Sequence, residues 1–251
     1  MRLILIFLAA LSCLEGKIIQ TNKLADALAF LDRSSWLLLD LDDTLLEGEN
    51  QLGRAKWYNY EIQKLMRQGA DCEIAQKSFY PQWILSQILC PVRTVEPNSA
   101  GVVAKAQEMA QCVMGLTSRH PPIASLSVEQ LQKLHIDLSK TAPTLPIGFE
   151  WGETLYRNGI WFITGFLSKG ETFARMLAAV SNPPKRVICV DDGRLHLEEM
   201  EKALQPLQIE FIGIHYTKAQ ERPFNPQVAE MQYSHLPEVL SDAEAALMIH
   251  P

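Results

Sequence analysis

The chain has 251 residues, of which 47% are hydrophobic and 21% are charged, and its formal net charge is −6. This composition excludes an intrinsically disordered chain, because it is too rich in apolar residues. The acidic balance argues against a nucleic-acid partner, which a diffuse positive field would attract. No apolar run approaches the roughly 18 residues that cross a bilayer, so we expect no membrane span. The length fits one large domain or a core domain with a smaller insertion.

The first sixteen residues differ from the rest of the chain. Arg2 precedes an apolar run from Leu3 to Leu11, and small residues follow it. This order is typical of a secretory signal peptide, although a short buried terminal element would have a similar composition. Residues 1–16 are therefore predicted to direct export, with a periplasmic or secreted mature protein. Lipid attachment at Cys13 is less favoured, because leucine is atypical at its place in such a cleavage site.

Helical and extended patterns alternate along the remaining chain. Apolar spacing predicts helices over 22–33, 51–68, 71–89 with an interruption near Pro81, 99–110, 127–134, 170–180 and 194–204. Continuous apolar runs predict strands over 36–39, 112–116, 186–190 and 209–214. Asn158-Gly159 predicts a hairpin between 154–156 and 160–163. Such alternation predicts a Rossmann-like α/β fold, a parallel sheet covered by helices, with its site at the carboxyl ends of the strands.

One connection is much longer than a crossover requires. Thr44 and Thr117 are 73 positions apart, and the surplus over 50–110 is helical and rich in aromatic residues. We therefore predict a core over 17–49 and 111–251 with a helical insertion over 50–110. The aromatic residues are interpreted as packing between the inserted helices. Arg54, Lys56 and Arg67 are interpreted as solvated positions on a helix face, with contact to an anionic substrate as the alternative.

The cysteines show neither a CxxC pair nor a metal-ligand spacing. Cys72 and Cys90 lie in one segment, so an exported protein could oxidise them to a disulfide, and buried free thiols are the alternative. Cys112 and Cys189 lie inside apolar runs and are interpreted as core residues.

Chemically active side chains follow successive predicted strands. In chain order these are Asp40, Asp42, Thr117, Arg119, Lys169, Asp191 and Asp192. Each alone is weak evidence, because a threonine, a lysine or an acidic pair at such a place often caps a helix or carries surface charge. A calcium loop at the first position is disfavoured, because Leu45 stands where that loop needs glycine. Arg119 is interpreted as either a substrate contact or a structural ion pair.

Together these residues predict a phosphoryl-transfer site. An aspartate carboxylate can attack phosphorus and form an aspartyl-phosphate. A magnesium ion, an ammonium and a hydroxyl donor can neutralise the anionic group that is attacked. A second carboxylate can protonate the leaving oxygen and then activate water.

Four stretches resemble the four motifs of the haloacid dehalogenase (HAD) superfamily of phosphohydrolases. They read WLLLDLDDTLL, VMGLTSR, SKGETFARML and RVICVDD, and the resemblance runs from about Trp36 to His215. The stretches LTSR, NGIWFITG-x-x-SKGE and VDDGRLHLEEM are also similar to an exported HAD-like bacterial family of unknown function. The resemblance implies that the insertion is a helical cap, which favours small phosphorylated substrates over proteins.

The resemblance also implies a role for each motif residue. Asp40 is then the nucleophile and a Mg²⁺ ligand. Asp42 is the general acid/base, with its backbone carbonyl on the metal. Thr117 is a hydrogen-bond donor to the phosphoryl oxygens, and Lys169 neutralises nucleophile and phosphate.

The fourth motif departs from the superfamily pattern. Asp192 is expected to complete the metal shell, with Asp191 beside it or sharing the ion, and the sequence does not decide between them. His196 stands where many members have another acid, and it is interpreted as a residue behind the ligands or at the surface.

The function predicted from these residues is a Mg²⁺-dependent phosphatase that hydrolyses a phosphate monoester through an aspartyl-phosphate. A non-enzymatic exported binding protein on the same scaffold is one alternative, motivated by the missing acid of the fourth motif. A phosphotransferase, which shares every residue named, is another.

Overall fold

The computed structural model describes residues 17–145, 152–165 and 167–249. The predicted signal peptide and Cys13 lie outside the described residues.

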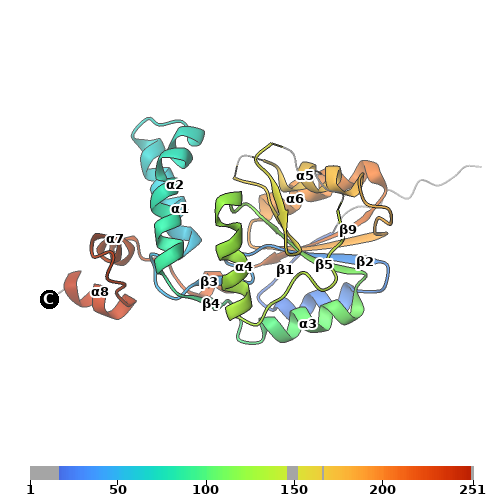
Figure 1. Ribbon diagram of the computed structural model, residues 1–251, viewed down its shortest axis with the longest axis horizontal. Coiled ribbons are helices and arrows are strands. Elements are labelled where there is room, and N and C mark those ends of the chain that lie inside the picture. The colour runs from blue at the N-terminus through green and yellow to red at the C-terminus, as the bar shows by residue number, and fades with distance from the viewer. Residues whose placement is uncertain (1–16, 146–151, 166, 250–251) are drawn as a thin grey trace, which may run out of the picture.

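A seven-stranded sheet forms the centre of the molecule (Figure 1). The strand order is β1-β9-β8-β2-β5-β7-β6, and every neighbouring pair is parallel except β6 with β7. The strands are β1 (Lys17–Thr21), β2 (Ser35–Leu39), β5 (Cys112–Thr117), β6 (Leu155–Arg157), β7 (Ile160–Phe162), β8 (Arg186–Asp191) and β9 (Glu210–Tyr216). The α/β architecture with a mostly parallel sheet is therefore confirmed, as is the hairpin at Asn158-Gly159.

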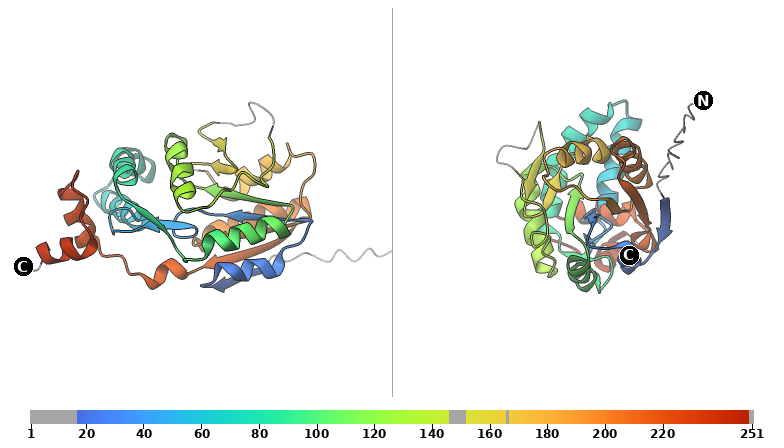
Figure 2. Two further views of the ribbon diagram at one scale, coloured as in Figure 1. Left: turned by 60° about the horizontal axis from the view of Figure 1, so that its bottom comes forward. Right: turned by 90° about the vertical axis from the view of Figure 1, so that its right-hand side faces the viewer.

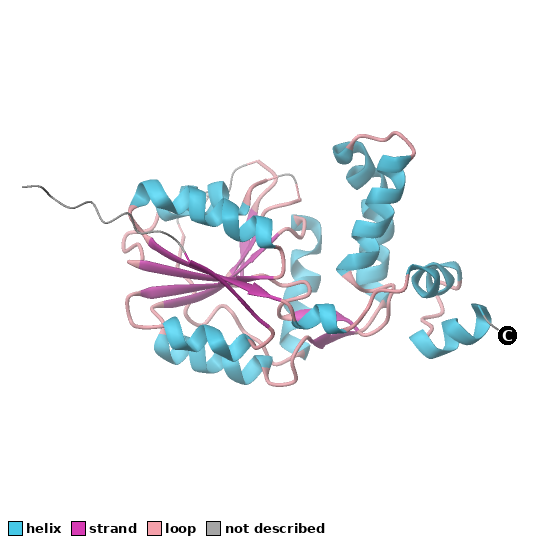
Figure 3. Cartoon of the chain, turned by 180° about the vertical axis from the view of Figure 1, so that it is seen from behind, coloured by secondary structure: helices cyan, strands magenta, loops and turns pink. Residues whose placement is uncertain are grey.

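Helices cover both faces of this sheet (Figure 3). All five residues of β2 are buried, with Leu37 and Leu39 in one core cluster and Trp36 and Leu38 in the other. The first cluster is closed by η1 (Leu24–Phe30), α3 (Ser99–Met109) and α4 (Ala124–Lys133), and the second by α5 (Lys169–Leu177) and α6 (Arg194–Leu204). The short 3₁₀ turns are η2 (Pro121–Ile123), η3 (Gln205–Leu207) and η4 (Lys218–Glu221).

A second group of helices stands beside the sheet (Figures 1 and 2). This helical body consists of α1 (Ala55–Arg67), α2 (Cys72–Leu89), α7 (Pro226–Ser234) and α8 (Asp242–Ile249). Trp57, Phe79, Trp83 and Ala229 form its buried cluster, with the Trp57 and Phe79 rings 4.9 Å apart. The antiparallel ribbon of β3 (Leu46–Gly48) and β4 (Val92–Thr94) connects α1 and α2 to the sheet.

The two bodies divide the chain differently from the predicted boundaries. The prediction places α3 in the insertion, but α3 packs on the sheet, because Val102, Val103 and Ala106 belong to its core cluster. The prediction also assigns 111–251 to the core. The last two helices instead join the helical body, because Ala229 of α7 packs against the aromatic residues of α1 and α2, and Ala245 of α8 packs with Val228 of α7.

Several local predictions were wrong. Residues 24–30 form a 3₁₀ helix within the predicted α-helix over 22–33. The short strands β1, β3 and β4 and the helices α7 and α8 carry patterns too short or too irregular for periodicity to detect. Helix α2 continues through Pro81, because the buried Phe79 and Trp83 anchor the turns on either side.

The cysteines of α2 cannot form a disulfide. Cys72 and Cys90 are free thiols at opposite ends of this 18-residue helix. At 1.5 Å per residue their separation is about 27 Å, far beyond the span of a disulfide. Among the described helices, none is both long and apolar enough to cross a bilayer.

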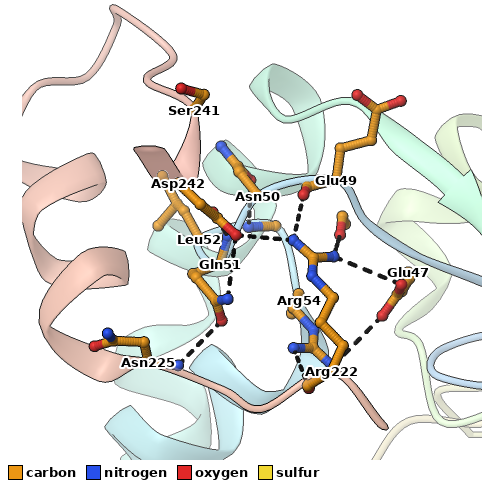
Figure 4. A network of polar contacts seen from close by, with 12 residues as sticks. Glu47, Glu49, Asn50, Gln51, Leu52, Arg54, Arg222, Asn225, Ser241 and Asp242 are labelled. Carbon is orange, nitrogen blue, oxygen red and sulfur yellow. Dashed lines mark hydrogen bonds and ion pairs between the residues drawn. The ribbon is translucent and has the colours of Figure 1, made fainter. Parts of the chain in front are cut away.

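Arg54 anchors the loop that leads into α1, residues 47–54, which we call the hinge loop. Its side chain is completely buried, so it is not on a solvated face. It donates hydrogen bonds to the carbonyls of Arg222 (2.8 Å) and Ala219 (3.1 Å), and its Nη2 lies 3.4 Å from Glu47 Oε2. The hinge loop is thereby bound to the segment that follows β9 (Figure 4).

Asp242 joins the C-terminal segment to the same loop (Figure 4). Its carboxylate pairs with Arg222 at 3.0 Å and accepts a hydrogen bond from the backbone N–H of Gln51 at 2.8 Å. Gln232 donates to Asp242 at 3.0 Å, and its Oε1 accepts from the N–H of Leu52 at 2.9 Å. An insertion alone would connect to the sheet through two segments, which here are β3 and β4. The segment from β9 to α7 is a third connection between the helical body and the sheet.

We predict that Arg54→Leu lowers the free energy of unfolding by about 3 kcal/mol, because it leaves the buried carboxylate of Glu47 with less compensating charge. Urea unfolding measures this change. Arg194→Leu is the control, because the Arg194–Glu198 pair is exposed and contributes less than about 1 kcal/mol. Equal small losses in both variants would show that the buried network does not hold the hinge loop.

Candidate active site

Three predicted site residues meet at the carboxyl end of the sheet. Asp40 directly follows β2, Asp191 ends the adjacent β8, and Lys169 begins α5. The Nζ of Lys169 lies 2.8 Å from Asp40 Oδ1 and 2.6 Å from Asp191 Oδ2. All three side chains are less than 10% exposed. A buried ammonium therefore bridges two buried carboxylates.

Local sequence explains where Lys169 lies. Ser168 caps α5 by accepting a hydrogen bond from the N–H of Glu171, so the helix begins at Lys169. The next position, Gly170, requires glycine because α5 and α6 approach closely there. A Cβ at this position would lie 2.3 Å from the carbonyl oxygen of Glu199. The close approach brings the first turn of α5 to the carboxyl edge of the sheet.

The three charges affect each other strongly. Burial raises the pKa of Asp40 to about 6, although Lys169 acts in the opposite direction. Burial also acts to raise the pKa of Asp191, but Lys169 and His196 outweigh it and lower that pKa to about 2. Burial alone would lower the pKa of Lys169, yet the carboxylates of Asp191 and Asp40 raise it. Lys169 and Asp191 are thus the permanently charged pair, and Asp40 is the less stable anion.

A divalent cation fits the acidic group beside this pair. Asp40, Asp191 and Asp192 each offer a carboxylate oxygen, and these atoms lie within 4.8 Å of one another. Burial and the carboxylates of Asp40 and Asp191 hold the pKa of Asp192 well above its usual range. When all three are ionised, they exceed the one ammonium of Lys169 by two negative charges, and carboxylate oxygens are hard donors of the kind that Mg²⁺ prefers.

The contacts of Asp191 bear on the choice between the two acids. Its Oδ2 binds Lys169, and its Oδ1 accepts from the N–H of Gly193 at 2.8 Å and faces His196 Nδ1 at 3.2 Å. These bonds favour Asp192 as the acid with an oxygen to offer a cation. His196 lies beside Asp191, and its interpretation as a residue behind the ligands or at the surface stays a prediction.

The Asp42 carboxylate lies outside the three-carboxylate group and is held by Arg119. Two parallel hydrogen bonds join them, from Nε to Oδ2 at 2.7 Å and from Nη2 to Oδ1 at 2.8 Å. The Arg119 side chain is 2% exposed and that of Asp42 is 20% exposed. Of the two readings of Arg119, the structure places it in an ion pair. The assignment of the Asp42 backbone carbonyl as a metal ligand stays a prediction.

All the predicted site residues except Asp191 line one cavity of about 260 Å³. Its wall includes Asp40, Asp42, Thr117, Lys169 and Asp192 from the sheet body. The helical body closes the other side with Tyr58, Asn59, Gln76 and Trp83, which the sequence did not mark as site residues. The cavity therefore lies where the sheet and the helical body meet.

The hydroxyl of Thr117 is suitably placed for an anion. Thr117 is the last residue of β5, and its side chain is almost fully buried. The hydroxyl oxygen Oγ1 accepts a hydrogen bond from the N–H of Arg119 at 3.2 Å. Its proton can therefore be donated to a ligand in the cavity. His120, which has no assigned role from the sequence, also lines the cavity, and its ring packs 4.2 Å from that of Tyr80.

Comparison with known proteins places the chain in a family. The family described as "Protein of unknown function (DUF2608)" matches residues 17–246, so the chain belongs to it. A relative from Chlamydia pneumoniae is 28% identical over 240 residues, 95% of this chain and 91% of the relative. One from Chlamydia trachomatis is 25% identical over 229 residues, 90% and 87% of the two chains. Both are named "Putative outer membrane protein". No solved structure matches.

We predict that Asp40→Asn raises the free energy of unfolding at pH 7 by roughly 2 kcal/mol when chelator is present. The native pKa of Asp40 is raised to about 6, so ionising this carboxyl destabilises the native state at neutral pH. As the pH falls through 6 toward 4, native Asp40 takes up a proton that the unfolded state does not, and the difference from the wild type shrinks. Urea unfolding at pH 7 and pH 4.5 measures it.

Glu238→Gln is the control for this measurement, because Glu238 is exposed. It is expected to change stability by less than about 0.5 kcal/mol at both pH values. If Asp40→Asn instead lowers the free energy of unfolding at pH 7, the ionised Asp40 does not destabilise the native state.

Proposed function

We propose that this member of the DUF2608 family is a Mg²⁺-dependent phosphatase that hydrolyses a small phosphate monoester through an aspartyl-phosphate. The observation that carries the proposal is the position of Asp40. Its carboxylate lies against the buried ammonium of Lys169 at 2.8 Å, beside two further carboxylates, at a cavity that Asp42 and Thr117 also line. The resemblance of the four motifs to HAD phosphohydrolases supports the same assignment.

In the first half-reaction an oxygen of Asp40 attacks phosphorus. The bond from phosphorus to the ester oxygen breaks, and protonated Asp42 gives its proton to that leaving oxygen. Lys169 offsets the negative charge of the nucleophile and of the phosphoryl group, and the Thr117 hydroxyl donates to a phosphoryl oxygen. The products are the free alcohol and the aspartyl-phosphate of Asp40.

In the second half-reaction water attacks the phosphorus of the aspartyl-phosphate. The carboxylate of Asp42 takes a proton from this water, and the bond between phosphorus and the Asp40 oxygen breaks. Orthophosphate leaves, and Asp40 and Asp42 return to their starting protonation states. The Lys169–Asp191 pair transfers no proton in either step, so its ammonium remains beside Asp40 while the charges on Asp40 and Asp42 change.

A divalent cation would be held by Asp40 and Asp192, with the Asp191 carboxylate beside them, and when bound it would supply the positive charge that lets a dianionic ester approach three carboxylates. The helical body beside the cavity favours a small substrate over a folded protein. The N-terminal pattern and the names of the chlamydial relatives support a place in the cell envelope or outside the cell.

We predict that the protein without residues 1–16 releases phosphate from p-nitrophenyl phosphate with Mg²⁺, and that Asp40→Asn lowers kcat by more than about 10⁴-fold. The reason is that the amide of asparagine cannot attack phosphorus. An unfolding curve of the variant is measured alongside, to check that it is folded. Glu238→Gln, an exposed acid-to-amide change, keeps wild-type turnover. Normal activity of Asp40→Asn would remove the proposed nucleophile, and absence of wild-type turnover on a broad panel of phosphate esters would refute the phosphatase.

A second prediction concerns the cation alone. Mg²⁺ at 100 times its dissociation constant should stabilise the wild type by about 2.7 kcal/mol, because only the native state gathers the three carboxylates. The melting temperature rises accordingly, and Asp192→Asn loses most of this rise. The rise is measured by thermal unfolding with added MgCl₂ against the same concentration of CaCl₂ and against NaCl of equal ionic strength. An equal rise in all three salts would mean screening, not a site.

A further inference from the structure

The guanidinium of Arg119 has no donor left for a substrate. Its Nε and Nη2 hold the two oxygens of Asp42, and Nη2 also donates to Gln87 Oε1 at 3.0 Å. Its Nη1 donates to Ser127 Oγ at 2.9 Å and to Gln130 Oε1 at 2.6 Å. An arginine carries five N–H donors, and these five bonds use all of them. The group is thus a fixed clamp on Asp42 and has no free fork for phosphate.

Gln87 connects this clamp to the helical body. It lies in the last turn of α2 and is 2% exposed. Besides accepting from Arg119, it donates from Nε2 to the carbonyl of Gly53 in the hinge loop at 3.0 Å. The backbone carbonyl of Gln87 accepts a hydrogen bond from Nε2 of Gln130 in α4 at 3.2 Å. A continuous set of hydrogen bonds, partly exposed at Asp42 and buried from Arg119 onward, therefore runs from Asp42 through Arg119 and Gln87 to the loop that leads into α1.

We propose that Arg119 is a positioning residue that fixes the acid/base carboxylate of Asp42, and that Gln87 makes this orientation depend on the seating of the helical body. The inference rests on the proposed phosphatase, in which Asp42 transfers the protons. The bidentate pair fixes both oxygens of Asp42 at once, which a single ammonium could not do. The link through Gln87 lets the position of α2 influence a proton transfer without α2 touching the phosphoryl group.

The clamp has a specific kinetic consequence. An alkoxide leaving group needs a proton as it departs, whereas p-nitrophenolate leaves without one. Misplacing Asp42 should therefore impair the first half-reaction of an alkyl phosphate and spare that of the aryl ester. The second half-reaction needs Asp42 for both substrates, because water must lose a proton whichever ester formed the aspartyl-phosphate.

The test compares kcat/KM for glycerol phosphate and p-nitrophenyl phosphate in Arg119→Lys and Gln87→Met, with Mg²⁺ present. Lysine keeps the charge of Arg119 and loses its fork, and methionine keeps the length of Gln87 and loses its hydrogen bonds. We expect kcat/KM for glycerol phosphate to fall by roughly 100-fold in Arg119→Lys and by roughly tenfold in Gln87→Met. The same constant for p-nitrophenyl phosphate should change less than about threefold.

A pre-steady-state readout adds a second signature. With p-nitrophenyl phosphate, Arg119→Lys should release a burst of about one p-nitrophenolate per enzyme before a slowed steady state, because water activation now limits turnover. Gln111→Met is the matched control. Gln111 directly precedes β5, and its Nε2 donates to the backbone carbonyl of Asn182 at 3.1 Å, so the substitution removes a comparable hydrogen bond away from Arg119, the hinge loop and the helical body. It should leave the ratio of the two esters unchanged.

The outcomes separate the inference from the function on which it rests. If both esters lose kcat/KM by the same factor and no burst appears, Arg119 is merely structural and the inference is overturned while the phosphatase stands. If Arg119→Lys does not fold, Gln87→Met decides, and a Gln87→Met enzyme indistinguishable from Gln111→Met refutes the link to the helical body. A wild type that turns over neither of these esters nor any other ester of the broad panel overturns the proposed function and the inference together.

Discussion

The buried ammonium of Lys169 between Asp40 and Asp191 is the interaction on which the candidate site depends. Its distances of 2.8 and 2.6 Å require three chain segments to meet: the end of β2, the end of β8 and the first turn of α5. Removing such a charge from water is unfavourable unless its partners are fixed, so the surrounding packing must be rigid. Gly170, which lets α5 lie against α6, is one part of that rigidity.

The same arrangement leaves the site with an excess of negative charge. Lys169 compensates one carboxylate fully, through Asp191, and leaves Asp40 and Asp192 with raised pKa values. Sites of this kind trade stability for function, because a group strained as an anion gains most from a cation or a phosphoryl group that relieves it. The net charge of −6 therefore does not prevent phosphate binding, which depends on the local field.

The connection between the two bodies adds a constraint of a different kind. The helical body is attached to the sheet through β3 and β4 and also through the C-terminal segment, where Asp242, Arg222 and Gln51 meet (Figure 4). The Arg119 clamp reaches this junction through Gln87 and Gly53. The Asp42 carboxylate, which we propose as the acid/base group, and the helices beside the cavity are thus connected through one polar network, and the proposed dependence of one on the other rests on this connection.

The sequence by itself determined the α/β architecture, the positions of Asp40, Asp42, Thr117, Asp191 and Asp192 at or just after strand ends, and the position of Lys169 at the start of a helix. It could do so because buried strands are continuous apolar runs and parallel strands deliver their carboxyl ends to one edge. Only the tertiary structure decided that α3 belongs to the sheet, that α7 and α8 belong to the helical body, and that Arg119 clamps Asp42. These facts depend on contacts between residues far apart in the chain, such as Arg54 with Arg222 and Gln87 with Arg119. Periodicity reports which face of an element is buried, and the identity of the partner is settled only when the whole chain packs.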